Sequence, residues 1–313
     1  MRRLDVGSDN VLRLEYTPDG TGLVVQGRDD DDTEVTVVWW DWQTEEEGPS
    51  WRTKVPAAFN GPHTLIAACR AGRWAPGLFD GRTRRTVGRL VWDDGGGAPV
   101  ELAITPNSRW LVVRSELEGN EGGLFWHEVP ARFWQSAVPR PRSTSGIAFS
   151  PSGEWYATQG EDNSFPVVPT DSHGGEALAY YGEAYWHCEE PGDCGLARVF
   201  LSEDVLVSIP GAYVDERLMG HTSLFLWDVP AREGREIPTG HDGPLTSAAV
   251  TADGLLLVTG SEDGTVRLWD TRGWSMLAAH DWTIGPVTAL AFAPDGRTCA
   301  AGGGDTVVIW DLD

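Results

Sequence analysis

The sequence predicts an all-β protein built from repeated units of short strands. Its clearest unit runs from Glu236 to Asp270, opened by Gly240-His241 and closed by Trp269-Asp270. Apolar residues inside this unit alternate as in half-buried strands, with turn residues between the runs. The three expected strands are Leu245–Val250, Leu255–Thr259 and Thr265–Trp269. The chain of 313 residues holds about seven units of roughly 45 residues. The predicted fold is therefore a seven-bladed β-propeller of four-stranded antiparallel blades, forming one domain over residues 1–313.

The unit Glu236–Asp270 resembles the repeat of the WD-repeat proteins. The resemblance implies that His241, in the loop before the first strand, bridges Asp263 in the tight turn and Thr259 on the second strand. Thr259 in turn reaches the indole N–H of Trp269. Such a network suits a buried blade edge, because an unpaired buried donor or acceptor costs roughly 1–3 kcal/mol. The His/Asp/Thr set can also be read as a hydrolytic triad, but the structural interpretation is favoured and no catalytic residue is expected there.

The first two units place charged turns between their second and third strands. The first unit ends in Trp40-Asp41, and its turn contains Asp29, Asp30, Asp31 and Asp32. The second unit ends in Trp92-Asp93, and its turn contains Arg82, Arg84 and Arg85. A run of like charge is more often a solvated loop than a binding site. Expected strands are Val11–Tyr16, Leu23–Gln26, Glu34–Trp40, Thr64–Cys69, a weak strand from Arg73, and Thr86–Trp92.

The next three units are less regular. In the third, His127 follows Trp126 where Asp is expected, and the fourth has no tryptophan at its end. The fifth ends in Trp227-Asp228. Expected strands are Val100–Ile104, Trp110–Arg114, Gly123–Trp126, Ser145–Phe149, Glu154–Thr158, Phe165–Pro169, Ala177–Tyr181, Leu196–Phe200, Val205–Ile209 and Thr222–Trp227.

The seventh unit has an incomplete network and no outer strand. Its expected strands are Val287–Phe292, Thr298–Ala301 and Asp305–Trp310, the last ending in Trp310-Asp311. Ala301 stands where Thr259 would be, so that a pairing of His280 with Asp305 is what remains. The N-terminal strand Arg3–Val6 has no partner in its own unit. We expect it to complete the seventh blade and close the ring, which removes exposed sheet edges.

A long insertion, 173–194, precedes the fifth unit. It contains Tyr185, Trp186, His187, Cys188 and Cys194. Zinc ligand pairs are usually about two to four residues apart and come with a second pair, so no metal site is expected. The alternative function is an enzyme, or a small-ligand or metal-binding propeller, with a polar site at the central channel. Its candidate residues are His173, Glu183, His187, Glu189, Glu190 and Asp193.

Composition narrows the possible environments and partners. The net charge of −23 argues against nucleic acid and against acidic membrane surfaces. No apolar run approaches the roughly 18 residues of a membrane span, and the four scattered cysteines suit a reducing compartment. We therefore expect a cytoplasmic monomer without a cofactor. Lys54 is the only lysine beside abundant arginine, a bias that favours a GC-rich bacterial genome.

The favoured function is a non-catalytic scaffold that binds a protein or peptide partner. Turns between second and third strands, and loops between blades, emerge on the same face, and most of these segments are acidic. Aromatic anchors ringed by charge are typical of binding hot spots, and an acidic rim suits a basic partner. That the charges only maintain solubility is equally compatible with the sequence. The predicted partner-binding residues are Asp29, Asp30, Asp31, Asp32, Glu161, Asp162, Tyr185, Trp186 and Trp282.

Overall fold

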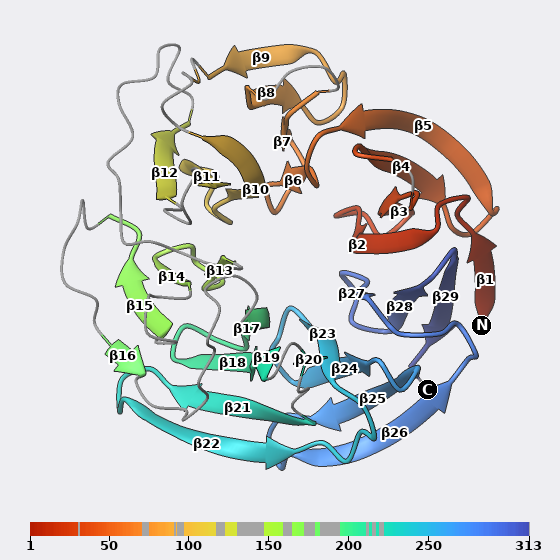
Figure 1. Cartoon of the computed structure of the whole chain (residues 1–313), viewed down its shortest axis with the longest axis vertical. Coiled ribbons are helices and arrows are strands. Elements are labelled where there is room, and N and C mark those ends of the chain that lie inside the picture. Colours follow the sequence, from red (N-terminus) through yellow and green to blue (C-terminus); the bar gives the residue numbers. More distant parts are fainter. Residues whose placement is uncertain are drawn as a thin grey trace.

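Seven blades surround a central axis in the computed structural model, shown in Figure 1. Every regular element of the described residues is a β-strand. No helix in this part of the chain is long and apolar enough to cross a membrane. The structure describes residues 1–30, 32–70, 75–90, 92, 97–116, 123–129, 147–158, 165–171, 179–181, 195–210, 213–214, 217–218 and 222–312.

Short polar turns set the length of the strands. In the sixth blade the Thr251 hydroxyl donates to Asp253 Oδ1 at 2.7 Å, and the same carboxylate accepts the Leu255 N–H at 3.0 Å. Gly254 completes this turn with φ of +72°, a conformation that costs glycine little. The first blade repeats the arrangement with Thr17 and Asp19. Each turn reverses the direction of the chain, and the alternation of apolar and polar residues resumes in the next strand.

Blades 1 and 2 come first along the chain. Blade 1 contains β2 (Asn10–Tyr16), β3 (Gly22–Arg28), β4 (Val35–Asp41) and β5 (Glu46–Thr53). Blade 2 contains β6 (Ala58–Phe59), β7 (Leu65–Ala68), β8 (Gly77–Asp80) and β9 (Thr86–Arg89).

Blades 3 to 5 form the next part of the ring. Blade 3 has three strands within the described residues, β10 (Ala98–Ile104), β11 (Trp110–Glu116) and β12 (Gly123–Glu128). Blade 4 contains β13 (Ala148–Phe149), β14 (Trp155–Ala157), β15 (Phe165–Pro169) and β16 (Ala179–Tyr181). Blade 5 contains β17 (Gly195–Phe200), β18 (Val205–Pro210), β21 (Ser223–Asp228) and β22 (Glu233–Pro238). A hairpin of β19 (Tyr213–Val214) and β20 (Arg217–Leu218) lies between β18 and β21.

Blades 6 and 7 lead back to the first blade. Blade 6 contains β23 (Leu245–Val250), β24 (Leu256–Ser261), β25 (Thr265–Asp270) and β26 (Ser275–Asp281). Blade 7 contains β27 (Ala289–Phe292), β28 (Thr298–Gly303), β29 (Thr306–Asp311) and β1 (Arg2–Asp5). β1 runs antiparallel to β29 with Leu4 opposite Val307, and the chain ends lie close together in Figure 1.

The apolar core lies between neighbouring blades. Val37 of blade 1 packs with Phe59 and Ile66 of blade 2, and equivalent clusters occupy the other blade boundaries. A buried amide reinforces the first boundary, because Gln26 Nε2 donates to the Ala57 carbonyl at 2.9 Å and Gln26 Oε1 accepts the Ala57 N–H at 2.7 Å. The ring is thus held by pairwise contacts, as in other repeat proteins.

The ring has two faces, which we call the top and bottom faces. Neighbouring strands in each sheet are antiparallel, so successive turns emerge on opposite sides. The top face carries the turns between second and third strands and the loops that connect blades. The bottom face carries the turns between first and second strands and between third and fourth strands.

The predicted strand assignment is wrong in the second unit. Leu65–Ala68 is the second strand of blade 2, and Thr86–Arg89 is the fourth. The third strand ends in Phe79-Asp80, where Phe79 lies opposite Ile66 as Trp269 lies opposite Leu257. Arg82, Arg84 and Arg85 therefore belong to the turn between third and fourth strands and lie on the bottom face.

The third unit is correct in its strands and wrong by one residue at its end. His127 lies opposite Leu111, which is the position of Trp269 in blade 6, and Glu128 takes the position of Asp270. Trp126 is its neighbour along the strand and packs instead in an apolar cluster with Tyr156. A shift of one residue places the side chain on the other side of the sheet.

Candidate functional site

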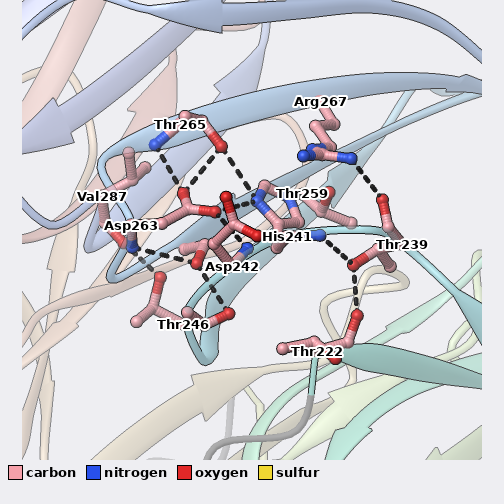
Figure 2. Close-up of polar contacts among 12 residues, drawn as sticks. Thr222, Thr239, His241, Asp242, Thr246, Thr259, Asp263, Thr265, Arg267 and Val287 are labelled. Atoms are coloured by element: carbon pink, nitrogen blue, oxygen red, sulfur yellow. Dashed lines mark hydrogen bonds and ion pairs between the residues drawn. The ribbon is translucent and has the colours of Figure 1, made fainter.

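A chain of hydrogen bonds links blade edge, loop and turn in blade 6 (Figure 2). His241 Nδ1 lies 3.0 Å from Asp263 Oδ2, and His241 Nε2 lies 2.9 Å from the Thr259 hydroxyl. The Trp269 indole N–H donates to the same hydroxyl at 3.1 Å. The structure thus brings together the four residues that the resemblance predicts. One consistent assignment has Trp269 donating to Thr259, Thr259 to Nε2 of a neutral His241, and His241 Nδ1–H to Asp263.

The electrostatics of the network favour a neutral imidazole facing a carboxylate. Burial lowers the pKa of His241, although its hydrogen bond to Asp263 works in the opposite direction. Burial alone would raise the pKa of Asp263, but hydrogen bonds from Thr265, Asp242 and His241 outweigh it and lower that pKa. Thr265 donates its hydroxyl to Asp263 Oδ1 at 2.7 Å, and the Asp242 N–H donates to Oδ2 at 2.9 Å.

This arrangement fits a structural role and not a hydrolytic triad. The His241 side chain has 0% exposure, and Thr259 is fully buried. A nucleophile must reach its substrate, whereas the Thr259 hydroxyl is engaged on both sides by His241 and Trp269. The set fixes the loop before β23 against the turn between β24 and β25.

The network is only partly repeated around the ring. In blade 5 the Trp227 indole N–H donates to the Ser208 hydroxyl at 2.8 Å, the equivalent of the contact between Trp269 and Thr259. In blade 7 Ala301 removes the acceptor, and Trp310 Nε1 is buried with no hydrogen-bond partner in the described part of the chain. Trp40 Nε1 of blade 1 is in the same state, because Trp40 lies opposite Leu23 and the position equivalent to Thr259 is the apolar Val25.

His280 does not take the place of His241 in blade 7. It lies on β26, the outer strand of blade 6, opposite Val266. Its ring stacks on Trp282 at 4.8 Å between centroids, and no contact between His280 and Asp305 occurs in the structure. The Asp305 carboxylate instead accepts the Thr306 hydroxyl at 2.8 Å. By its position before β27, Thr283 is the residue equivalent to His241.

The Trp282 side chain takes part in the packing between blades 6 and 7. Its ring centroid lies 4.3 Å from that of Trp310, and it packs on the apolar cluster between blades 6 and 7. Trp282 is thus a partly buried packing residue as well as a predicted partner-binding residue. Its exposed part remains available for the predicted contact with a partner.

The aspartate run in blade 1 is partly neutralised. Asp32 forms an ion pair with Arg52 at 2.9 Å, and neighbouring Glu34 forms one with Lys54 at 2.9 Å. Asp30 accepts the Asn10 side-chain amide at 2.7 Å and stays exposed, and Asp29 is half-buried. Asp31, Glu161, Asp162, Tyr185 and Trp186 lie outside the described residues.

A wider acidic sector covers the top face over blades 6, 7 and 1. Seven exposed carboxylates from this sector form no ion pair within the described residues. Sequence reasoning missed several of them, because they are single acidic residues at the ends of separate strands. The fold brings them onto one side of three consecutive blades. They are Asp5, Asp9, Asp30, Asp242, Glu262, Asp281 and Asp305.

The residues proposed for a metal or enzyme site are not placed. His173, Glu183, His187, Cys188, Glu189, Glu190, Asp193 and Cys194 all lie outside the described residues. Among the residues that are described, no group of three or more His, Cys, Asp or Glu side chains is arranged to hold a metal ion.

Comparison with known proteins adds to this geometry. The family "WD domain, G-beta repeat" matches residues 234–270 and 275–311. A guanine nucleotide-binding protein subunit beta from Oryza sativa subsp. japonica is 25% identical over 222 residues, 67% of this chain and 54% of the relative. Pre-mRNA-processing factor 19 from the same plant is 39% identical over 74 residues, 24% of this chain and 14% of the relative. Its small ribosomal subunit protein RACK1y is 34% identical over 91 residues, 29% and 27% of the two chains.

Solved structures show the same fold at low sequence identity. The Kuenenia stuttgartiensis hydrazine synthase aligns with a TM-score of 0.71 and 12% identity, covering 99% of this chain and 97% of that one. A likeness at this identity speaks for the fold alone. The chain spans 54% or less of the length of the three relatives named above.

Fold and network together define the class of the protein as a seven-bladed propeller with a structural His–Asp–Thr–Trp hydrogen-bond network in blade 6. Residues 234–311 match two repeats of the WD family, within a chain that folds as a seven-bladed β-propeller.

Proposed function

We propose that this protein is a non-catalytic scaffold that binds a basic segment of a protein partner on the acidic sector of the top face. The carrying observation is the set of seven exposed carboxylates over blades 6, 7 and 1 that lack counter-ions within the described residues. Such a sector attracts a Lys- or Arg-rich segment, speeds its approach and repels acidic competitors. The scaffolding role of the relatives supports the same reading.

The sector differs from the site that the sequence alone suggests. The predicted site is centred on the aspartate run of blade 1, whereas the acidic sector is centred on blades 6 and 7. The reason is that Arg52 and Lys54 already form ion pairs with carboxylates of blade 1. Asp242, Glu262 and Asp281 line successive loops there. A basic segment crossing from blade 6 to blade 1 would meet these carboxylates in turn.

We further propose that the protein acts as a monomer in a reducing compartment such as the cytoplasm. The thiols of Cys69 and Cys299 are buried, and burial raises the pKa of both. Such thiols are unreactive because the thiolate is disfavoured. The likeness to hydrazine synthase, at 12% identity, concerns the fold alone and gives no support to an enzymatic function.

A paired set of charge variants tests the partner site. The test variant combines Asp242→Asn, Glu262→Gln, Asp281→Asn and Asp305→Asn. The control combines Glu46→Gln, Glu47→Gln, Glu233→Gln and Glu236→Gln, all exposed on outer strands. Both remove the same charge, so a difference between them reports position. The probe is a fluorescein-labelled octapeptide of alternating Arg and Ala, followed by stopped-flow anisotropy at two salt concentrations.

We expect the test variant to bind the probe several-fold more weakly than the control, chiefly through a slower association rate at low salt. A pull-down with mass spectrometry then identifies natural partners, which should be retained by the control and lost by the test variant. Equal binding by the two variants would show that the acidic sector serves solubility only.

A further inference from the structure

We propose that a pocket on the bottom face, between blades 1 and 2, binds an acidic segment of a protein partner through a Glu or Asp carboxylate. The pocket has a volume of about 600 Å³ and lies on the face opposite the acidic sector. A site in this pocket is distinct from the site of the proposed function, because it would bind an acidic ligand and not a basic one. Its size is within the range of roughly 300–1,000 Å³ of ligand sites.

The pocket has an apolar wall and a basic rim. Trp39 from β4 and Phe59 from β6 form the wall, with ring centroids 6.0 Å apart and nearly perpendicular planes. Arg82 and Arg84, from the turn between β8 and β9, form the rim. His63 takes a turn position where blades 1, 4, 6 and 7 have glycine, and its ring stacks on Phe59 at 4.9 Å.

Arg84 is held in place without an anionic partner. Its guanidinium carbon lies 4.5 Å from the centroid of Trp39, and its buried Nε makes no hydrogen bond within the described residues. Burial lowers the pKa of Arg84, which shows that desolvation of its charge is not balanced by a nearby counter-ion. A bound carboxylate would supply both the missing acceptor and the charge.

The acidic groups around the pocket have other partners. Asp80 Oδ1 accepts the N–H and the hydroxyl of Thr83, each at 2.6 Å, and Asp19 Oδ1 accepts the Thr17 hydroxyl at 2.6 Å. Both carboxylates thus serve their own turns. The hydrogen bonds from Thr83 are the main cause that lowers the pKa of Asp80, with a smaller contribution from Arg82. None of Arg82, Arg84 and Arg85 forms an ion pair within the described residues. His63 Nε2 is taken by Glu15 at 2.8 Å.

These surroundings favour a carboxylate over a phosphate group. A guanidinium presents a planar fork that matches a carboxylate. Asp19 and Asp80 stand at the same rim and repel a doubly charged phosphate more strongly than a singly charged carboxylate. The apolar wall of Trp39 and Phe59 would contact the side chains flanking the acidic residue, which gives a peptide an advantage over a small free acid.

Fluorescence anisotropy with three labelled heptapeptide pools tests the site. The pools carry Glu, Gln or phosphoserine at the central position and a mixture of Ala, Leu, Pro and Phe elsewhere. The variants are Arg84→Gln and Arg82→Gln, with Arg232→Gln as matched control. Arg232 has the same left-handed backbone as Arg84 in the corresponding turn of blade 5, with φ of +59° against +55°, and lies outside the pocket.

We expect the Glu pool to bind most tightly, and Arg84→Gln to weaken it by about tenfold, as for loss of a charge-assisted hydrogen bond. Arg82→Gln should weaken binding less, and Arg232→Gln should leave it unchanged. Arg82 is exposed, so its variant keeps the test valid if loss of the Trp39 contact unfolds Arg84→Gln. Equal binding of the Glu and Gln pools would overturn the proposal. Tightest binding of the phosphoserine pool would replace it with a phosphopeptide site.

Discussion

Removal of the Thr259 hydroxyl is the sharpest perturbation of the blade 6 network. We expect Thr259→Val to lower the free energy of unfolding by roughly 2–6 kcal/mol. The substitution leaves two buried atoms unpaired, the Trp269 indole N–H and His241 Nε2, at roughly 1–3 kcal/mol each. The side-chain volume hardly changes, so no cavity adds to this figure.

Thr259→Ser keeps the hydroxyl and removes only the methyl group, so it distinguishes their contributions to stability. It should cost less than about 1 kcal/mol, because blade 5 makes the equivalent contact with Ser208 at 2.8 Å. Stability is measured by urea denaturation at neutral pH, followed by circular dichroism and tryptophan fluorescence together, with coincident curves required before free energies are compared. If Thr259→Ser costs as much as Thr259→Val, the hydroxyl network is not what stabilises the blade.

Three further outcomes are expected. Ala301→Ser should raise the free energy of unfolding by about 0.5–1.5 kcal/mol, because the new hydroxyl gives the buried Trp310 N–H an acceptor. Ala300→Ser, at a buried neighbouring position, is the control and should lower it. A destabilised Ala301→Ser protein would contradict the alignment of blades 6 and 7. Burial lowers the pKa of His127 from 6.5 to about 4, so stability should be complete above pH 6.5 and fall by about 3 kcal/mol as the pH drops to about 4. His127→Phe, which copies Phe79 of blade 2, should flatten that dependence, and an unchanged slope would assign it to other groups. Deletion of residues 1–9 should lower the melting temperature by many degrees, since it removes β1 from β29; an unaltered melting curve would refute ring closure by the N-terminal strand.

The strands were largely predictable because their cues are local. The turn residues Thr251, Asp253 and Gly254 bond to one another within a few positions, and the same pattern marks the first turn of blade 1. Trp269-Asp270 marks the end of a third strand without reference to distant residues. The first three strands of blade 6 were therefore predicted to within two residues, whereas its outer strand, β26, was not predicted.

Strand order within a weak unit was not predictable, because any half-buried strand has the same alternation. Blade 2 begins with Ala58–Phe59, only two residues long, and ends its third strand with Phe79-Asp80. Trp92 then offered a false end point, and every strand moved by one place. The basic turn moved with them to the other face of the ring.

Contacts between side chains of different elements could not be predicted from the sequence either. The ion pair between Asp32 and Arg52 joins the turn between β3 and β4 to β5, and it depends on the register of β4 and β5. Trp282 and His280 were expected to act in a loop and a polar network, respectively. Their tilted ring contacts with Trp310 depend on the close approach of blades 6 and 7.

Opposite charge preferences on the two faces lead to a final prediction. A basic ligand on the top face and an acidic ligand in the bottom pocket should bind together without competing. The residues concerned are separate, with Asp242 and Asp305 on one face and Arg84 on the other. Independent sites have no coupling free energy. Saturation with the Arg/Ala octapeptide should therefore leave the dissociation constant of the Glu-centred pool unchanged, except for the effect of direct attraction between the two oppositely charged peptides. That attraction is tested by raising the salt concentration, which screens it over a Debye length of about 8 Å at physiological ionic strength. Competition that persists at high salt would mean that both peptides use one site, and the assignment of the acidic segment to the bottom pocket would then fail.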